Sequence, residues 1–203
     1  MGIKLHLPSQ HDGQYNKEPL WRKPCHTQTN IEPHYVSWLL DNSSLTKKLI
    51  EKSRGDFRID VLQQSVRAVS FCERKALQMP QRQWAVIREV VLCGNDVPWV
   101  YARTVIPLST LRGSLRRLYY LGNQSLGEQL FTDTSMFREP VEIALLSAHY
   151  FSQTVLKQLQ QTIPVVTSTW GRRSVFRLSD KPLLVSEIFL PALFNVPLIK
   201  APQ

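Results

Sequence analysis

The sequence lacks the features of a disulfide-rich, zinc-binding or membrane-spanning protein. Its 203 residues include only three cysteines, Cys25, Cys72 and Cys93, which are far apart and show no CxxC spacing. This pattern favours free thiols in a reducing, cytoplasmic environment over a disulfide framework or a zinc site. The most apolar stretch, 183–199, is interrupted by Glu187 and by prolines, so we expect no membrane-spanning helix.

The signature motifs of hydrolytic and cofactor-dependent enzymes are absent as well. The chain contains no GxSxG, HExxH, GxGxxG or P-loop segment. Its five histidines are scattered and form no recognisable ligand set (His6, His11, His26, His34 and His149). We therefore expect neither a metal nor a cofactor.

Acidic residues are few. The 16 Asp and Glu residues stand against 25 Lys and Arg residues, which gives a formal net charge of +9. This charge favours an anionic partner, which could be a nucleic acid, a lipid surface or a small carboxylated metabolite. The basic residues are dispersed, with nothing longer than adjacent pairs, so we expect no nucleic-acid partner and no stable insertion into a membrane.

The first pair of predicted helices lies near the N-terminus. Apolar residues at helical spacing follow Pro33, and the break at 41–44 supplies an N-cap for a second helix that begins at Leu45. A DNA-reading helix-turn-helix is a minor alternative, because the second helix offers lysines and one arginine but no array suited to base edges.

A second pair of helices is predicted in the middle of the chain. Its first helix spans 109–122, and Ser125 and Glu128 form a capping box that starts the next helix at Leu126. Leu126 and Leu45 both stand in the first turn of a helix, where backbone N–H groups have no partner inside the helix. Each is either a ligand anchor or a core leucine.

Strand patterns account for most of the remaining chain. They occupy 59–71, 84–93, 99–106, 136–146 and 163–169, followed by a hairpin over 170–191, with one further helix expected at 149–161. Short turns between the strands predict a mostly antiparallel sheet of about six strands in an α+β fold. We expect one domain over 33–203. It is preceded by a flexible leader over 1–32, in which the apolar residues follow neither the helical nor the strand period.

Two charged side chains interrupt apolar strand faces. Alternation places Glu187 on the face of Val185 and Phe189, and Arg88 on the face of Val86 and Val90. A bare buried charge costs several kcal/mol, so each needs a partner. Arg88 and Glu187 either form a buried ion pair or hold the carboxylate and the hydroxyl of a small planar ligand between them. The pattern alone leaves both readings open.

Five segments carry a resemblance to a known family. They are LTKKLIEK, IREVVLC, PWVYARTVIPLSTL, SLGEQLF and WGRRSVFRLSDKPLLVSEIFLP. The sequence resembles the chorismate pyruvate-lyases, which convert chorismate to 4-hydroxybenzoate and pyruvate for ubiquinone synthesis. The resemblance implies a six-stranded antiparallel sheet and an internal cavity beneath two helix-turn-helix flaps, without metal or cofactor. We also expect a cytoplasmic monomer, and inhibition by the product, because an enclosed ligand leaves only when the flaps open.

The resemblance also implies roles for four residues. Arg88 would hold the ring carboxylate of substrate and product, and Glu187 would meet the hydroxyl, so these two form the implied catalytic pair. Leu45 and Leu126 would contribute backbone contacts from the two flaps.

Two segments and one alternative function qualify the resemblance. The leader 1–32 has no counterpart in the family, and 147–164 resembles an insertion. The fold also resembles the effector domain of bacterial transcription regulators, which binds a metabolite without turning it over. Those regulators carry a winged-helix DNA-binding domain ahead of the sensor, and the leader is too short for one. We therefore expect a lyase.

Overall fold

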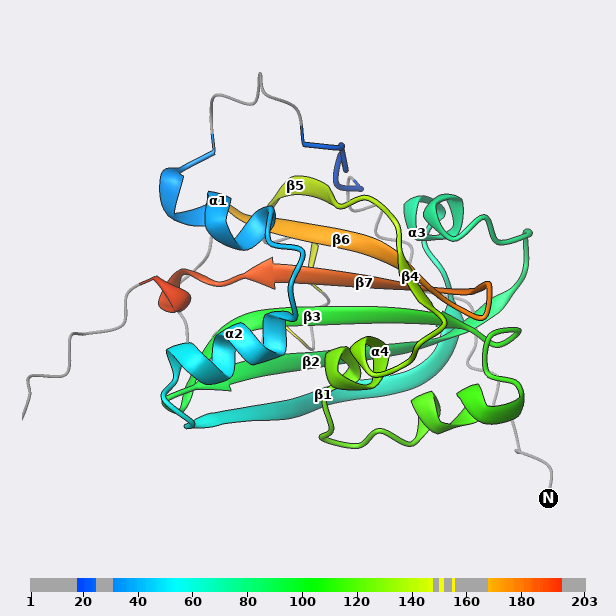
Figure 1. Ribbon diagram of the computed structural model, residues 1–203. Helices are drawn as coiled ribbons and strands as arrows, with labels where there is room; N and C mark the ends of the chain where they lie inside the picture. Colours follow the sequence, from blue (N-terminus) through cyan, green and yellow to red (C-terminus); the bar gives the residue numbers. More distant parts are fainter. Residues whose placement is uncertain (1–17, 25–30, 148–149, 152–154, 156–167, 195–203) are drawn as a thin grey trace, which may run out of the picture.

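The computed structural model describes residues 18–24, 31–147, 150–151, 155 and 168–194. The described chain forms one sheet of seven strands, all paired antiparallel. The strands are β1 (Phe57–Ala68), β2 (Trp84–Gly94), β3 (Val97–Pro107), β4 (Met136–Arg138), β5 (Glu142–Ser147), β6 (Ser168–Leu178) and β7 (Lys181–Phe189). Their order is β1-β2-β3-β7-β6-β4, with β5 paired to β6 beside β4 (Figure 1). The predicted α+β fold with an antiparallel sheet is confirmed.

The predicted strand over 136–146 is divided into two strands. β4 pairs with the end of β6 and β5 pairs with its beginning, so both lie along the same edge of that strand. Pro140 stands between them and has no N–H for the ladder, which accounts for the break.

Two tight turns fix the register of the sheet. Asn95 and Asp96 join β2 to β3, and Ser179 and Asp180 join β6 to β7, and all four residues have positive φ angles between 46° and 62°. Such two-residue turns match the twist of an antiparallel hairpin. The second turn sets Leu178 opposite Lys181, and every pair further along the hairpin follows from it.

The helices are α1 (Pro33–Leu39), α2 (Leu45–Lys52), α3 (Phe71–Ala76) and α4 (Leu126–Phe131), with 3₁₀ helices η1 (Gly113–Tyr119) and η3 (Pro191–Leu193). The first predicted pair, α1 and α2, is confirmed. In the second pair, α4 is confirmed. The first helix is shorter than predicted, because the Thr110 hydroxyl donates to the carbonyl of Pro182 and Gly113 has a φ of 59°, so the helix begins only at η1. α3 is an element that the strand pattern over 59–71 did not predict.

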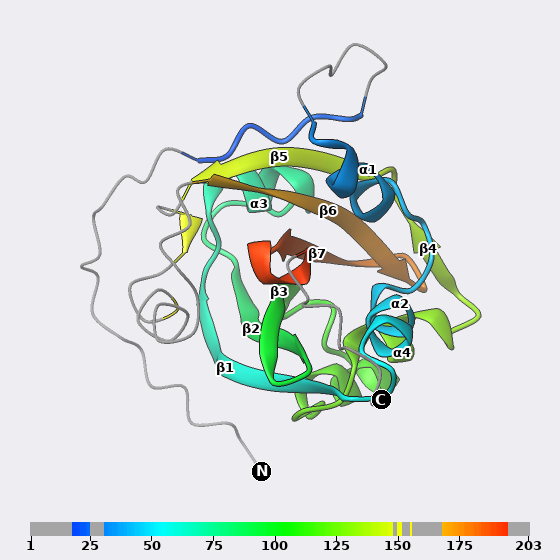
Figure 2. The ribbon, with the colours of Figure 1, turned by 90° about the vertical axis from the view of Figure 1, so that its left-hand side faces the viewer.

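The two faces of the sheet have different covers. α2 and α4 lie side by side over one face (Figure 1), and α3 lies on the other side of the molecule (Figure 2). On the α3 side, Trp21 packs with Tyr101, Phe151 and Ile188. Trp21 belongs to 18–24 of the predicted leader, and the neighbouring Arg22 pairs with β5. Most of the predicted elements at 149–161 and 163–169 lies outside the described residues.

Candidate active site

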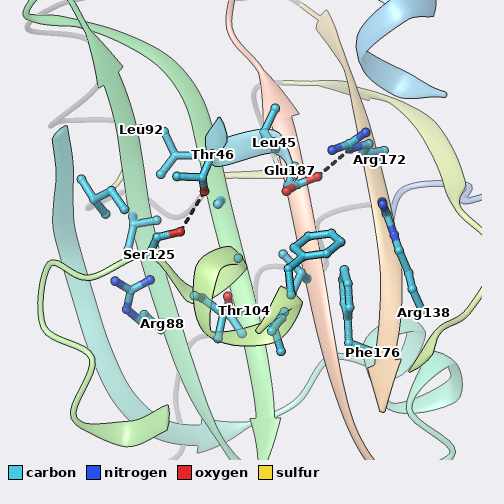
Figure 3. A pocket seen from close by; sticks show the side chains of 18 of the residues that line it. Leu45, Thr46, Arg88, Leu92, Thr104, Ser125, Arg138, Arg172, Phe176 and Glu187 are labelled. Carbon is cyan, nitrogen blue, oxygen red and sulfur yellow. Dashed lines mark hydrogen bonds and ion pairs between the residues drawn. The ribbon is translucent and has the colours of Figure 1, made fainter. Parts of the chain in front are cut away.

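A pocket lies between the sheet and the first turns of α2 and α4 (Figure 3). It leaves about 50 Å³ for the centres of water molecules, room for a few waters or a small ligand. The flaps, which we define as 33–52 and 113–131, supply the cover, and the sheet supplies the floor. The lining residues are Ser43, Leu45, Thr46, Ile59, Arg88, Val90, Leu92, Ala102, Thr104, Ser125, Leu126, Gly127, Leu130, Phe131, Arg138, Arg172, Phe176, Val185 and Glu187.

The four residues singled out from the sequence all line this one pocket. Arg88 and Glu187 come from the floor, on β2 and β7, and Leu45 and Leu126 come from the cover, each as the first residue of its helix. Both leucines are also buried, with 6% and 7% of their surface exposed, so they belong to the core as well as to the pocket wall.

The floor consists of two neighbouring rows of cross-strand partners. One row runs Arg88, Thr104, Val185 and Ser174 across β2, β3, β7 and β6. The next row, two residues along each strand, runs Val90, Ala102, Glu187 and Arg172. Arg88 and Glu187 are therefore in different rows and have β3 between their strands, about 10 Å of sheet width.

Arg88 is a buried cation that has no carboxylate partner in the part of the chain that the structure describes. It is 3% exposed, and its Nη2 donates to the carbonyls of Gly122 at 2.8 Å and Gln124 at 3.3 Å. Its Nε is buried and has no hydrogen-bond partner among the described residues. Burial lowers the pKa of the Arg88 guanidinium, so the site would gain from an added anion. The ion pair between Arg88 and Glu187, which the sequence left open, does not form.

Glu187 is instead paired with Arg172, the residue directly opposite on β6. Arg172 Nε donates to Glu187 Oε2 at 2.6 Å, and Nη1 donates to the carbonyls of Trp38, at 2.7 Å, and Asp41 in the first flap. The Arg172 side chain is 2% exposed and that of Glu187 is 17% exposed. This pair joins the floor of the pocket to the α1–α2 turn.

Sequence reasoning missed Arg138, which also lines the pocket, and Arg172, the partner of Glu187. The signal was present in the turn at 179–180, because a two-residue loop there places Arg172 opposite Glu187. Alternation within a single strand identifies the face on which a side chain lies but does not identify its partner on the next strand, so it leaves Arg88 as a candidate partner of Glu187.

The two flaps contact each other above the pocket. The Thr46 hydroxyl in α2 and the Ser125 hydroxyl that caps α4 are 2.9 Å apart and hydrogen-bonded (Figure 3). A Cβ atom at Gly127 would lie 3.2 Å from Thr46 Oγ1, so the absence of a side chain there permits the close approach. Ser125 also accepts from the Glu128 N–H, which is one half of the predicted capping box.

Comparison with known proteins identifies the family. The model of the family described as Chorismate lyase matches residues 16–198. A relative from Psychromonas ingrahamii named "Probable chorismate pyruvate-lyase" is 39% identical over 169 residues, which are 82% of this chain and 87% of the relative. The chorismate pyruvate-lyase of Salmonella newport is 33% identical over 162 residues, which are 80% of this chain and 86% of the relative.

The chain belongs to the chorismate lyase family. The resemblance noted from the sequence is therefore confirmed, and the match begins at residue 16, inside the segment that the five motifs left uncovered.

Two solved structures show the same fold. A GntR-family regulator from Bacillus cereus has a TM-score of 0.51 at 9% identity and covers 72% of this chain and 99% of that chain. The C-terminal domain of Yurk from Bacillus subtilis has a TM-score of 0.50 at 17% identity, covering 66% and 90%. At these identities the likeness shows the fold alone.

The described part of this chorismate lyase family member contains no group of three or more His, Cys, Asp or Glu residues that could hold a metal ion. Its described helices are all too short or too polar to cross a membrane.

Proposed function

We propose that this member of an enzyme family converts chorismate to 4-hydroxybenzoate and pyruvate in the pocket beneath the flaps. The observation that carries the proposal is the buried cation Arg88, free of any described carboxylate, in the same enclosed pocket as Glu187. A guanidinium there fits a ring carboxylate, and a carboxylate at the other position fits a ring hydroxyl. The family's role in supplying the ring precursor of ubiquinone matches this chemistry.

The reaction needs little chemical assistance. Chorismate is a cyclohexadiene that carries a hydroxyl on C4 and an enolpyruvyl ether on C3. Breaking the C3–O bond and losing the C4 hydrogen gives aromatic 4-hydroxybenzoate, and the same hydrogen, delivered to the enolpyruvyl methylene, gives pyruvate. Aromatisation makes this step strongly favourable, so the principal work of the pocket is to hold the substrate in one orientation.

Each end of the ring has its own partner. Arg88 binds the ring carboxylate, and the first-turn N–H groups of the flaps at Leu45 and Leu126 complete the polar contacts, as the family resemblance implies. Glu187 accepts a hydrogen bond from the C4 hydroxyl and orients that carbon. Arg172 keeps the Glu187 carboxylate in place.

Cellular location and assembly follow from the same proposal. We propose that the protein acts as a monomer. Cys72 and Cys93 are free thiols, which supports a reducing, cytoplasmic location. The excess of basic residues serves a dianionic substrate, and we propose no nucleic-acid partner.

A metabolite sensor is the second candidate, because one solved structure with this fold is a GntR-family transcriptional regulator. Incubating the purified protein with chorismate separates the two functions. A lyase releases 4-hydroxybenzoate and pyruvate in equal amounts over many turnovers. Binding of chorismate or 4-hydroxybenzoate without release of pyruvate would contradict the proposal and support a sensor.

A further inference from the structure

Four charged side chains line the pocket, and only two of them neutralise each other. Arg172 and Glu187 form the ion pair across β6 and β7. Arg88 and Arg138 form no ion pair with any residue that the structure describes. The pocket therefore has two uncompensated positive charges, whereas 4-hydroxybenzoate brings only one carboxylate.

Arg138 is held by neutral groups that leave part of its guanidinium free. Its Nε donates to the Ser174 hydroxyl at 3.1 Å, and its Nη1 donates to the carbonyl of Asn42 at 3.2 Å. Its third nitrogen, Nη2, makes no hydrogen bond within the described chain. The guanidinium also lies 5.3 Å from the ring centre of Phe176, which limits its orientations. These contacts position the cation without using its charge.

The electrostatic surroundings of Arg138 favour an added anion. Burial first, and then the positive charge of Arg172, lower the pKa of Arg138, while Glu187 and Asp41 act in the opposite direction. The opposing carboxylates already have cationic partners of their own, Arg172 and Lys48. Arg138 is thus the cation at the Glu187 end of the pocket whose charge is not used by an ion pair.

The row geometry separates Arg138 from Arg88. Ser174, which receives the Arg138 Nε–H, is the last member of the floor row that begins at Arg88. Three strand spacings place the Cα atoms of Arg88 and Ser174 roughly 14 Å apart in the sheet. Figure 3 shows Arg88 and Arg138 on opposite sides of the pocket, with Glu187 nearer to Arg138. Two arginines reaching inward over this span suit a small dicarboxylate.

From this geometry we propose that Arg138 binds the enolpyruvyl carboxylate of chorismate while Arg88 binds the ring carboxylate. The inference rests on the proposed function. The enolpyruvyl ether is on the ring carbon next to the hydroxyl-bearing one, so its carboxylate projects from the Glu187 end. Arg138 is then the residue that distinguishes substrate from product, because the carboxylate it binds leaves as pyruvate and 4-hydroxybenzoate retains only the contact with Arg88.

The test compares two ligands that differ only in the second carboxylate. The compound 3-(carboxymethoxy)-4-hydroxybenzoate carries a carboxylate on the ether beside the hydroxyl, and 3-methoxy-4-hydroxybenzoate has a methyl group on the same ether. Calorimetric titration measures both affinities for the wild type and for Arg138→Gln. We expect the variant to bind the dicarboxylate on the order of 10- to 100-fold more weakly and the methoxy compound unchanged.

Two further variants control the experiment. Arg177→Gln removes a neighbouring arginine on β6 that pairs with Glu139 and does not line the pocket, and both affinities should stay at wild-type values. Arg138→Lys keeps the positive charge but lacks the bidentate guanidinium, so it should recover part of the affinity for the dicarboxylate. This variant also tests the inference if the Gln variant folds poorly.

The inference would be overturned if a folded Arg138→Gln variant lost equal affinity for both ligands, or lost affinity for neither. Chorismate turnover by the wild type is measured in parallel and tests the proposed function separately. Turnover with no ligand discrimination refutes only the role of Arg138, and absent turnover refutes the lyase assignment on which that role rests.

Discussion

Nε of Arg172 lies 2.6 Å from Oε2 of Glu187, between directly opposed positions of β6 and β7. The same guanidinium donates to two carbonyls of the α1–α2 turn, at Trp38 and Asp41. One side chain therefore connects the carboxylate of the pocket floor to the first flap. Any change in Glu187 acts on the flap as well as on the ligand.

A double-mutant cycle measures this coupling. Arg172→Met and Glu187→Gln each disrupt a buried ion pair, and removal of one partner costs about 3–5 kcal/mol when it leaves the other charge buried. Because the double variant leaves neither charge, it should recover part of the loss. Urea denaturation of the four proteins gives the free energies of unfolding. Strictly additive losses would show that the two side chains do not depend on each other.

Glu187→Gln tests whether Glu187 orients the substrate or transfers a proton. Glutamine keeps an oxygen that can accept from Arg172 and from a ring hydroxyl, so the variant should retain much of the turnover rate, whereas Glu187→Ala should not. Steady-state kinetics with chorismate measures both. A folded Gln variant that binds 4-hydroxybenzoate normally but loses about 10²–10⁴-fold in rate would establish acid-base catalysis and contradict the orienting role.

The hydrogen bond between Thr46 and Ser125 should slow product release, because the product leaves only when the flaps separate. A net hydrogen bond contributes about 0.5–1.5 kcal/mol, so Thr46→Val should raise the dissociation rate of 4-hydroxybenzoate by roughly 2- to 12-fold. Stopped-flow displacement measures this rate, with Thr46→Ser as the control that keeps the hydroxyl. Equal rates in all three proteins would show that this contact does not hold the flaps closed.

Buried ion pairs on the opposite face of the sheet predict that the fold loses stability in acid. Arg103 donates to Glu73 at 2.7 Å and to Glu89 at 2.9 Å. Burial opposes ionisation of both carboxyls, but Arg103, together with hydrogen bonds from Ser70 to Glu73 and the contacts of Tyr101 and Arg67 with Glu89, holds the pKa of each below its usual value. The pKa values of Glu73 and Glu89 are lower in the folded state than in the unfolded state. The two ionised carboxylates therefore stabilise the fold above about pH 4.5, and this stability is lost as the pH falls further.

Urea denaturation between pH 3 and pH 7 tests this dependence. The free energy of unfolding should fall below about pH 4.5 in the wild type and in the exposed control Glu51→Gln. Glu89→Gln should show a smaller decrease, because one of the two carboxyls no longer titrates. Identical pH profiles for all three proteins would show that these carboxyls do not determine acid stability.

Local patterns in the sequence were sufficient to place the pocket but not to pair its charges. Arg88 and Glu187 could be recognised because each is a charge in an apolar strand face, and both line the pocket. Their actual partners depend on strand order and register. β3 lies between β2 and β7, and the turn at 179–180 places Arg172 opposite Glu187. Neither fact follows from alternation within a single strand.

Smaller differences have similar causes. α3 is capped by Ser70 and Glu73, a capping box that was hidden within a stretch of strand-like alternation. Pro140 divides one predicted strand into β4 and β5, and Arg138, at the end of β4, is held in the pocket by Ser174, Asn42 and Phe176. Such contacts connect residues far apart in the chain, which periodicity does not report.

The most direct test of the central claim is the joint rate at which 4-hydroxybenzoate and pyruvate form from chorismate, compared between the wild type, Arg88→Ala and the exposed control Arg116→Ala. We predict equimolar products from the wild type and the control. Removal of a buried cation that binds the substrate costs about 2–5 kcal/mol, so kcat/KM of Arg88→Ala should fall at least about 30-fold. A wild type that releases no pyruvate, or a folded Arg88→Ala variant with the wild-type kcat/KM, would contradict catalysis in this pocket.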